Sequence, residues 1–345
     1  MKILNEVEIS VILPTYNRAN LISRAITSVI NQTYQKFQLI IVDDDSIDNT
    51  EMIIKEYNNP KICYLKHPYN MGPAEARNTG IKYARSNYLA FIDSDDKWFP
   101  EKLEKQLEVF LKYSYNNLGI VYSDMIRVDK DNREIYWRSP DFKLEVKDLY
   151  KKSLNYEVEN IGISTAMIRK ECLEKIGYFD PNLKRLIDLE LFIRLSKYFN
   201  FYHLEIPLIY YYETESGVSS SIINLINARK YILNKYFEDI STDKKILSNH
   251  YFLIGFALYQ DNNVKESKKY LDKSIITYPS NLKNTFRSLL IITTNGKLYN
   301  FLSVIKRKII QFISIVKYGF YILRKKGIKV FLIKISKFFT KNKNS

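Results

Sequence analysis

The sequence predicts an α/β protein in which a mostly parallel sheet is covered by helices on both faces, followed by an all-helical C-terminal extension. Short runs that are apolar throughout alternate with helical patterns over the first hundred residues, as buried parallel strands do. Beyond Ser221 only helical patterns are found. The 345 residues are 46% hydrophobic and 26% charged, which indicates a globular chain with one large or two modest domains.

The first hundred residues contain four apolar runs that we interpret as strands. These runs cover residues 8–16, 37–45, 61–67 and 88–93. Apolar side chains at helical spacing predict helices between them, at residues 21–30, 47–57 and 72–86. Ser46 is the expected N-cap of the second helix. The order of strands and helices is typical of a sheet built from βαβ units.

The pattern after residue 100 is mixed. Pro100 is suited to the first turn of a helix that runs to about Tyr113, and residues 119–137 indicate two strands joined by a turn at Asp131–Asn132. We expect further elements at residues 163–168 (strand), 170–176 and 188–198 (helices) and 207–212 (strand). Residues 250–281 look like one tetratricopeptide unit. The predicted divisions of the chain are 1–100, 101–220, 221–298 and 299–345.

Cysteine content and the N-terminal residues suggest the compartment. The two cysteines, Cys63 and Cys172, are too few and too far apart for a disulfide framework or a metal knuckle. A reducing compartment is therefore expected. The first 17 residues carry Glu6 and Glu8 and have no small-residue cleavage site, so we interpret them as the approach to a strand and not as a signal peptide. These features predict a cytoplasmic protein.

Two acidic clusters follow predicted strands. Asp93, Asp95 and Asp96 end the fourth strand, and residues 43–45 end the second. The carboxyl ends of parallel strands meet at one edge of a sheet, where ligands bind. Like charges this close repel one another, and one of them would usually have a raised pKa. A solvated turn with a helix cap is one interpretation, but a divalent cation, Mg²⁺ or Mn²⁺, accounts better for the crowding.

The second cluster suggests a nucleoside site. A carboxylate can accept a hydrogen bond from a base N–H or from a ribose hydroxyl. One alternative is that Asp45, Ser46 and Asp48 only cap the next helix. Capping uses one carboxylate, so it does not account for Asp43 and Asp44. A nucleoside held here would place its diphosphate toward the first cluster.

Five stretches of the chain together resemble family 2 glycosyltransferases with the GT-A fold, whose sheet is Rossmann-like. They are SVILPTYNR, IIVDDDSIDNT, GPAEARNTGI, YLAFIDSDDKWFPEKLEKQ and IRKECLEKIGYFDPNLKRLIDLELFIRLSKY, and they extend the resemblance over residues 8–220. The resemblance implies a nucleotide-sugar donor, a UDP-sugar in particular, and a divalent metal, Mn²⁺ or Mg²⁺. It also implies inversion at the anomeric carbon, a glycan or lipid-linked acceptor, and a role in surface polysaccharide synthesis (capsule or lipopolysaccharide).

The resemblance also implies roles for individual residues. Asp188 corresponds to the catalytic base, and Glu190 to an orienting or acceptor-side carboxylate. Asp95 would be the metal ligand, with Asp93 near the ribose or the metal. The expected nucleotide-sugar-binding residues are Pro14, Tyr16, Arg18, Asp44, which would hold the base, Arg77, which would lie near the phosphates, and Asp93.

The chain departs from the family pattern at two places. Ile187 precedes Asp188 where the family usually has Glu, which puts a supporting contact in doubt. Residues 209–220 carry Tyr and Glu where the family often has Arg or His, so we assign no phosphate or metal contact there. His67, His203 and His250 match no motif position, and we expect them to be structural.

Other functional classes fit the sequence less well. A nucleotidyltransferase, a Rossmann dehydrogenase or a P-loop enzyme would carry a glycine-rich phosphate loop after the first strand, and ILPTYNRAN has none. A non-catalytic nucleotide-sugar binder or scaffold with a degenerate domain remains an alternative, favoured only by Ile187. Slow, metal-dependent hydrolysis of a nucleotide sugar would distinguish an enzyme from a binder.

Positive charge is concentrated at the C-terminal end. Asp272 is the last acidic residue, and 16 Lys or Arg follow it. Removing these 16 charges from the net charge of +15 leaves −1 for residues 1–272. Such an asymmetry suggests an anionic partner for the C-terminal segment.

Residues 301–337 combine an apolar helical face with basic side chains. The apolar positions are Ile305, Ile309, Phe312, Val316, Phe320 and Leu323. Lys317 interrupts the longest apolar run, so no membrane-spanning helix is predicted. A helix packed on the body is one alternative, and nucleic-acid binding is disfavoured because no base-reading module is present. We favour an interfacial helix that holds the protein on the inner, anionic face of the cytoplasmic membrane.

Overall fold

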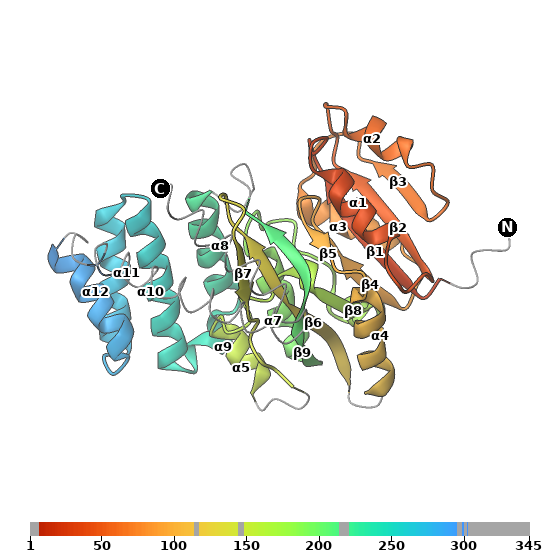
Figure 1. Ribbon diagram of the computed structural model, residues 1–345. Coiled ribbons are helices and arrows are strands. Elements are labelled where there is room, and N and C mark those ends of the chain that lie inside the picture. The colour runs from red at the N-terminus through yellow and green to blue at the C-terminus, as the bar shows by residue number, and fades with distance from the viewer. Residues whose placement is uncertain are drawn as a thin grey trace, which may run out of the picture.

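The computed structural model describes residues 7–113, 117–143, 148–213 and 221–294, together with residues 299 and 302. Within these residues nine strands form one sheet in the order β3-β2-β1-β4-β8-β6-β9-β5, with β7 paired to β6 (Figure 1). The basic segment predicted to bind a membrane, residues 299–345, lies outside the described residues except for Tyr299 and Leu302.

The first four strands are parallel, as predicted. They are β1 (Ile9–Thr15), β2 (Phe37–Asp43), β3 (Ile62–Lys66) and β4 (Tyr88–Phe91). Alternate side chains of β1 enter two different cores: Val11 and Leu13 pack on one face of the sheet and Ile12 on the other. Since both faces are buried, these strands read as continuous apolar runs.

Helices cover both faces of this sheet, which confirms the predicted fold class. The core that contains Val11 also receives side chains from α1 (Ile22–Ile30), α2 (Thr50–Glu56) and α4 (Lys102–Lys112). The core that contains Ile12 receives side chains from α3 (Pro73–Tyr83), α6 (Lys170–Ile176) and α7 (Ile187–Ser196).

The sheet continues without interruption into the second half of the chain, where its pairing is mixed. The strands there are β5 (Lys97–Trp98), β6 (Leu118–Val128), β7 (Glu134–Trp137), β8 (Ala166–Arg169) and β9 (Asn200–Tyr212). β8 runs antiparallel to β4 and β6, whereas β9 runs parallel to β6. A 3₁₀ turn, Ile163–Thr165, leads into β8, and α5 covers Leu149–Leu154.

Several predicted boundaries are wrong. The strand expected at residues 163–168 begins only at Ala166, because residues 163–165 form the 3₁₀ turn, and the helix expected at residues 72–86 ends at Tyr83. Helix α2 begins at Thr50 and not at residue 47, because the expected capping side chains bond elsewhere. The Ser46 hydroxyl accepts from the Asn17 N–H, and Asp48 accepts from the Thr50 N–H. Strand β9 begins at Asn200, seven residues before the expected start at 207. Buried and half-buried side chains alternate in residues 200–204, so this part lacks the apolar run that marks a fully buried strand.

The C-terminal extension is helical, as predicted. It consists of α8 (Ile222–Lys235), α9 (Phe237–Ser241), α10 (Lys244–Gln260), α11 (Val264–Thr277) and α12 (Leu282–Thr294). Helices α10 and α11 form the predicted helix–turn–helix, and they approach so closely that a Cβ at Gly255 would lie 2.9 Å from Leu271. None of the described helices is long and apolar enough to cross a bilayer.

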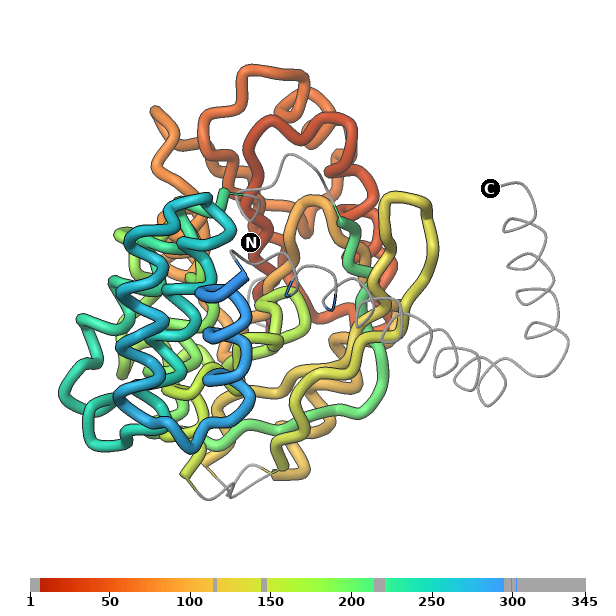
Figure 2. The backbone as a smooth tube through the Cα atoms, turned by 90° about the vertical axis from the view of Figure 1, so that its left-hand side faces the viewer, coloured from red at the N-terminus to blue at the C-terminus, as the bar shows by residue number. Residues whose placement is uncertain are grey.

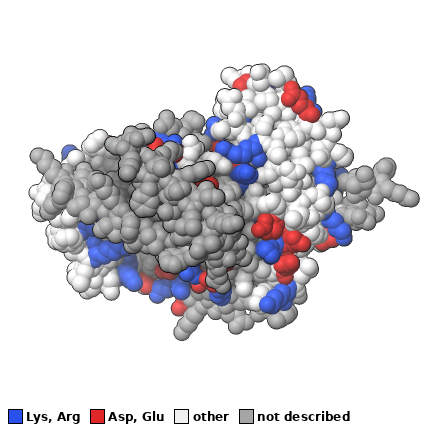
Figure 3. Space-filling model, viewed as in Figure 1, with Lys and Arg blue, Asp and Glu red and all other residues white. Residues whose placement is uncertain are grey.

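The extension lies at the end of the molecule opposite the parallel strands (Figure 1). Figure 2 views the molecule from the side of the extension, with α12 as its outermost helix. On the face drawn in Figure 3, acidic and basic side chains of the described residues are interspersed, in keeping with the near-neutral charge of residues 1–272.

Candidate active site

A cleft of about 840 Å³ opens where β1, β2 and β4 end. One wall comes from these strand ends and from α3, and the other comes from β6, the 3₁₀ turn and the start of α7. Eight of the nine residues predicted for the site line it: Pro14, Tyr16, Arg18, Asp44, Arg77, Asp93, Asp95 and Asp188. The two acidic clusters therefore meet in one cleft, as the parallel strands predict.

Two glycines allow helix α3 to bring Arg77 to this cleft. Gly72 has a φ of +90°, a backbone conformation that L side chains rarely adopt, and it lets the chain turn into α3 at Pro73. One helical face of α3 lies directly on β1, because a Cβ at Gly80 would come within 2.6 Å of Ile12. Arg77, in the middle of this helix, is thereby held at the cleft wall with only 8% of its side chain exposed.

Arg77 joins the acidic loop to the rest of the site. Its Nη2 donates to Asp93 Oδ1 at 2.6 Å. Burial by itself would lower the pKa of the guanidinium, but the carboxylates of Asp93 and Asp188 outweigh burial and raise it. The loop is also held by its backbone, since the Asp93 N–H donates to the Ser164 hydroxyl at 3.0 Å and Arg24 donates to the Asp95 carbonyl.

Asp96 is the fully buried carboxyl group of the loop. Burial raises its pKa well above the usual value, and the nearby charges of Asp93 and Asp95 raise it further. Neither carboxyl oxygen has a partner at hydrogen-bonding geometry, although the Ser164 hydroxyl and the Tyr212 N–H are near enough to favour the anion. The expectation that one carboxylate of the loop has a raised pKa is confirmed, and the residue is Asp96.

The side chains of the acidic loop could supply only some of the ligands that a divalent cation needs. Among the described residues, no three His, Cys, Asp or Glu side chains are grouped so that they could hold a metal ion together. Asp93 and Asp95 both line the cleft, and their charges act on the buried Asp96, so a cation would relieve the repulsion. Such an ion would need further oxygen ligands from a bound substrate, which is how Mg²⁺ is usually held.

Asp188 lies at the start of α7, on the opposite wall of the cleft. Leu186, the residue before this helix, has the left-handed conformation, with a φ of +59°. Asp188 Oδ2 accepts from the Ile163 N–H at 3.1 Å. Burial raises the pKa of Asp188, Arg77 opposes this rise, and the charge of Asp93 adds to it. A carboxylate with a raised pKa in a cleft is suited to accept a proton.

Asp44 organises the loop that precedes α3. Its Oδ1 accepts from His67 Nδ1 at 2.7 Å and from the Met71 N–H at 2.8 Å, and its Oδ2 accepts from the Gly72 N–H at 2.7 Å. A carboxylate has about four acceptor positions, so Oδ2 can take one further donor. The predicted contact to a nucleobase therefore has one position available. His67 is buried and also bonds Thr79, which fits a structural role.

The structure does not bring Glu190 to the cleft. Residues two apart on a helix point in directions about 200° apart, so Glu190 faces away when Asp188 faces the cleft. Its buried carboxylate accepts from Arg194 at 2.8 Å, from Lys235 at 2.8 Å and from the Tyr236 hydroxyl at 2.7 Å. These contacts connect α7 to α8, so Glu190 stabilises the packing of the two helices. Its position does not support the predicted role as an orienting or acceptor-side carboxylate.

Several cleft residues were not among the predicted ones. They include Ser164, Arg127, Tyr211, Lys184 and Arg185. Burial raises the pKa of Tyr211 to about 12, and the charges of Asp96 and Asp93 contribute. The basic pair Lys184–Arg185, so close to Asp188, is the only one of these features that the sequence could have indicated. Ile187 is buried in the core beside the cleft.

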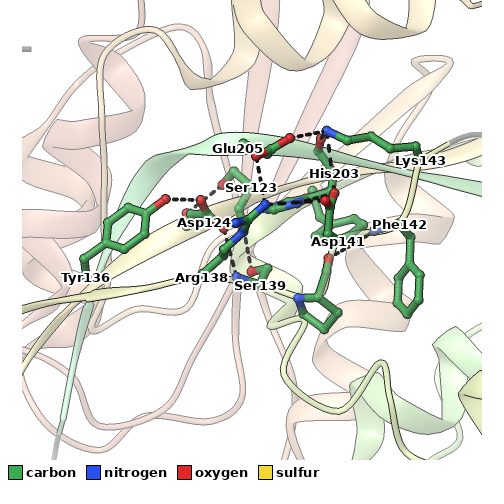
Figure 4. A network of polar contacts seen from close by, with 12 residues as sticks. Ser123, Asp124, Tyr136, Arg138, Ser139, Asp141, Phe142, Lys143, His203 and Glu205 are labelled. Carbon is green, nitrogen blue, oxygen red and sulfur yellow. Dashed lines mark hydrogen bonds and ion pairs between the residues drawn. The ribbon is translucent and has the colours of Figure 1, made fainter. Parts of the chain in front are cut away.

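A second polar network lies outside the cleft, around the buried His203 (Figure 4). His203 Nε2 lies 2.7 Å from Asp124 Oδ1 on β6, and Nδ1 lies 3.2 Å from Asp141 Oδ1. Asp124 also accepts from the Ser139 N–H at 2.8 Å and from the Tyr136 hydroxyl. The network fastens residues 138–143 to the sheet, so the expectation that His203 is structural agrees with its contacts.

Comparison with known proteins identifies the family. The family model described as glycosyl transferase family 2 matches residues 10–177. The putative teichuronic acid biosynthesis glycosyltransferase TuaG of Bacillus subtilis is 32% identical over 222 residues, which cover 62% of this chain and 82% of TuaG. The chain belongs to glycosyl transferase family 2. Its relatives include glycosyltransferases of polysaccharide biosynthesis.

Another relative and a solved structure extend the comparison. The Escherichia coli enzyme WfgD, a UDP-Glc:alpha-D-GlcNAc-diphosphoundecaprenol beta-1,3-glucosyltransferase, is 43% identical over 116 residues, covering 34% of this chain and 45% of WfgD. The fold resembles residues 1–349 of S. aureus TarS, solved with UDP-GlcNAc, with a TM-score of 0.60, 21% identity and coverage of 77% and 79%. The match covers 49% of the longer TarS chain. The GT-A fold expected from the sequence is confirmed.

Proposed function

We propose that this protein is a metal-dependent, inverting glycosyltransferase that moves a sugar from a UDP-sugar to a hydroxyl group of a glycan or lipid-linked acceptor. The observation that carries this proposal is the cleft itself, where Asp188 lies on one wall and Arg77 and the acidic loop lie on the other. The carboxylates of Asp93 and Asp188 raise the pKa of Arg77, so a cationic side chain faces the place of an anionic donor. Asp188 is the catalytic base in this proposal.

The base acts on the acceptor. A sugar hydroxyl is a weak nucleophile until a positioned base takes its proton during attack, and such help is worth about 10²–10⁴ in rate. Asp188 accepts that proton while the acceptor oxygen bonds to the anomeric carbon and the bond from this carbon to the diphosphate breaks. Attack from the face opposite the diphosphate inverts the configuration.

The opposite wall holds the donor. Arg77, which Asp93 and Asp188 keep positively charged, binds the diphosphate, and Asp44 uses its remaining acceptor position on the nucleobase. Pro14, Tyr16 and Arg18 border the nucleotide. A Mn²⁺ or Mg²⁺ ion bound by Asp95 with Asp93 would neutralise charge on the leaving diphosphate.

The names of the relatives support a role in surface polysaccharide synthesis. TuaG is named for teichuronic acid biosynthesis, and WfgD is named for transfer from UDP-Glc to a sugar on diphosphoundecaprenol. A lipid-linked acceptor would place the enzyme at the inner face of the cytoplasmic membrane, where the basic residues 299–345 would meet anionic lipid.

A thermal-shift screen of nucleotide sugars with Mn²⁺, followed by measurement of UDP release, tests this proposal. A donor that binds only the folded protein raises its melting temperature. We expect a UDP-sugar to do so and to be hydrolysed slowly when Mn²⁺ is present. Binding without UDP release, with or without candidate acceptors, would favour the non-catalytic binder, and no response to any UDP-sugar would contradict the donor class.

A further inference from the structure

Helix α12 buries Ile291 against the extension, but it also exposes a stripe of large apolar side chains. Its buried side chains include the polar Asn284 and Ser288. Its outward stripe consists of Leu282, Phe286 and Leu289, which are 78%, 59% and 46% exposed. These three positions are separated by four and three residues, so they lie on one helical face. Contiguous exposed apolar side chains, unlike scattered single ones, mark an interaction surface.

Basic side chains border this stripe. Lys283 and Arg287 line the same shallow surface hollow as Leu282, Phe286 and Leu289, and we refer to these five residues as the α12 patch. No Asp or Glu follows residue 272, so α12 carries no carboxylate. The surface that complements the α12 patch must therefore be anionic and able to take up apolar side chains.

We propose that the α12 patch docks on an anionic lipid bilayer, with Leu282, Phe286 and Leu289 inserted at the boundary between headgroups and acyl chains. Lys283 and Arg287 would then reach the anionic headgroups, as basic side chains of interfacial helices do. Helix α12 lies at the outer end of the helical extension (Figure 1), and Leu282, Phe286 and Leu289 are exposed there. This inference is independent of the proposed glycosyl transfer, because none of the patch residues lines the cleft.

Two other occupants fit the charges less well. A second copy related by two-fold symmetry would set the α12 patch against itself and bring Lys283 and Arg287 near their own copies, with no carboxylate on α12 to offset these charges. Residues 303–345 of the same chain contain 12 Lys or Arg and no Asp or Glu, so covering the patch with them would add like charge. Anionic lipid is the occupant that neutralises the charge of the patch.

Vesicle sedimentation of the full-length protein tests the proposal. The vesicles contain phosphatidylcholine alone or an equal mixture with phosphatidylglycerol. The test variant carries Leu282→Asn, Phe286→Asn and Leu289→Asn. The control variant carries Met52→Asn, Leu111→Asn and Ile223→Asn, three exposed apolar side chains of α2, α4 and α8. Both variants keep the basic C-terminal segment, so differences between them report on the patch.

We expect the test variant to bind the anionic vesicles at least ~10-fold more weakly than the parent, and the control variant to bind like the parent. A second variant, with Lys283→Gln and Arg287→Gln, should lose about five-fold per basic side chain. In a third, F286W, indole fluorescence should be quenched by brominated lipid, whereas in L111W it should not. Melting temperature and donor hydrolysis should stay at the parent values throughout.

Three results would overturn the proposal. The first is equal binding of the test and control variants, which would assign membrane affinity to other residues. The second is binding to phosphatidylcholine alone that matches binding to the anionic mixture. The third is concentration-dependent self-association without vesicles that the test variant loses, since the patch would then be an interface between copies of this chain.

Discussion

The substitution Asp188→Asn tests the proposed mechanism most directly, because it removes basicity and keeps shape. Asp188 Oδ2 accepts one backbone bond, from the Ile163 N–H at 3.1 Å, and the Oδ1 atom of Asn can accept the same bond. Arg77 keeps its ion pair with Asp93 at 2.6 Å. We therefore expect the affinity for the donor to change little. The melting temperature at neutral pH should be equal to that of the parent or slightly higher, because burial of the charged Asp188 carboxylate raises its pKa and so costs stability at this pH.

Turnover should fall by at least ~10², and by up to ~10⁴ if Asp188 is the only base, which corresponds to roughly 3–5 kcal/mol of barrier. The pH profile should change as well. Burial raises the pKa of Asp188 above its usual 3.8, so parent activity should decline as the pH falls through this raised value and the base becomes protonated. The variant, having no carboxyl group to titrate, should lack this acid limb.

The assay is the initial rate of UDP release with saturating donor and acceptor over a range of pH. The exposed Asp131→Asn serves as the matched control and should behave like the parent. Near-normal turnover in Asp188→Asn, or an unchanged acid limb at reduced turnover, would remove Asp188 from the role of base. A lower rate with a large loss of donor affinity would instead indicate a binding role.

Four further predictions concern other parts of the molecule. Asp95→Ala should abolish turnover and weaken donor binding, and a chelator should do the same to the parent; full activity in excess chelator would contradict the metal proposal. Asp96→Asn should raise the melting temperature at neutral pH, because a carboxyl with a raised pKa favours the fold only at low pH; the gain should shrink as the pH falls toward 4. His203→Phe should lower the free energy of unfolding by about 1–3 kcal/mol in denaturant titrations, since the buried Asp124 loses a partner; an unchanged value would mean that the network of Figure 4 adds no stability. Truncation after residue 300 should leave donor hydrolysis intact and reduce transfer to a lipid-linked acceptor more than transfer to a soluble one; an equal loss for both would argue against a membrane role for this segment.

Local patterns in the sequence were enough to predict most elements of the fold. The apolar runs of β1, β2 and β4 report burial on both faces directly, and α6 was predicted at its observed bounds, Lys170–Ile176. The error at the start of α2 arose because a side chain bonds across the chain. Ser46 would have capped a helix locally, but its hydroxyl meets the Asn17 N–H, 29 residues away. A capping preference is weak compared with such tertiary contacts.

The sequence likewise predicted some features of the site and not others. Strand order alone places Asp44 and Asp93 at one edge of the sheet, because parallel strands must end together. The sequence likewise determined that three carboxylates crowd one loop. It could not determine that Asp96 is the one with the strongly raised pKa, because this depends on which side chain the surrounding core excludes from water.

Only the tertiary structure decided which helical side chains face the cleft, the protein interior or the surface. Asp188 and Glu190 are both carboxylates on α7, yet one faces the cleft and the other is held by Arg194 and Lys235. Lys235 lies 45 residues further along the chain, so no local pattern could have indicated this pairing. The outward apolar stripe of α12 was equally hidden, because helical spacing shows that Leu282, Phe286 and Leu289 share a face but not whether that face meets the body or the surroundings.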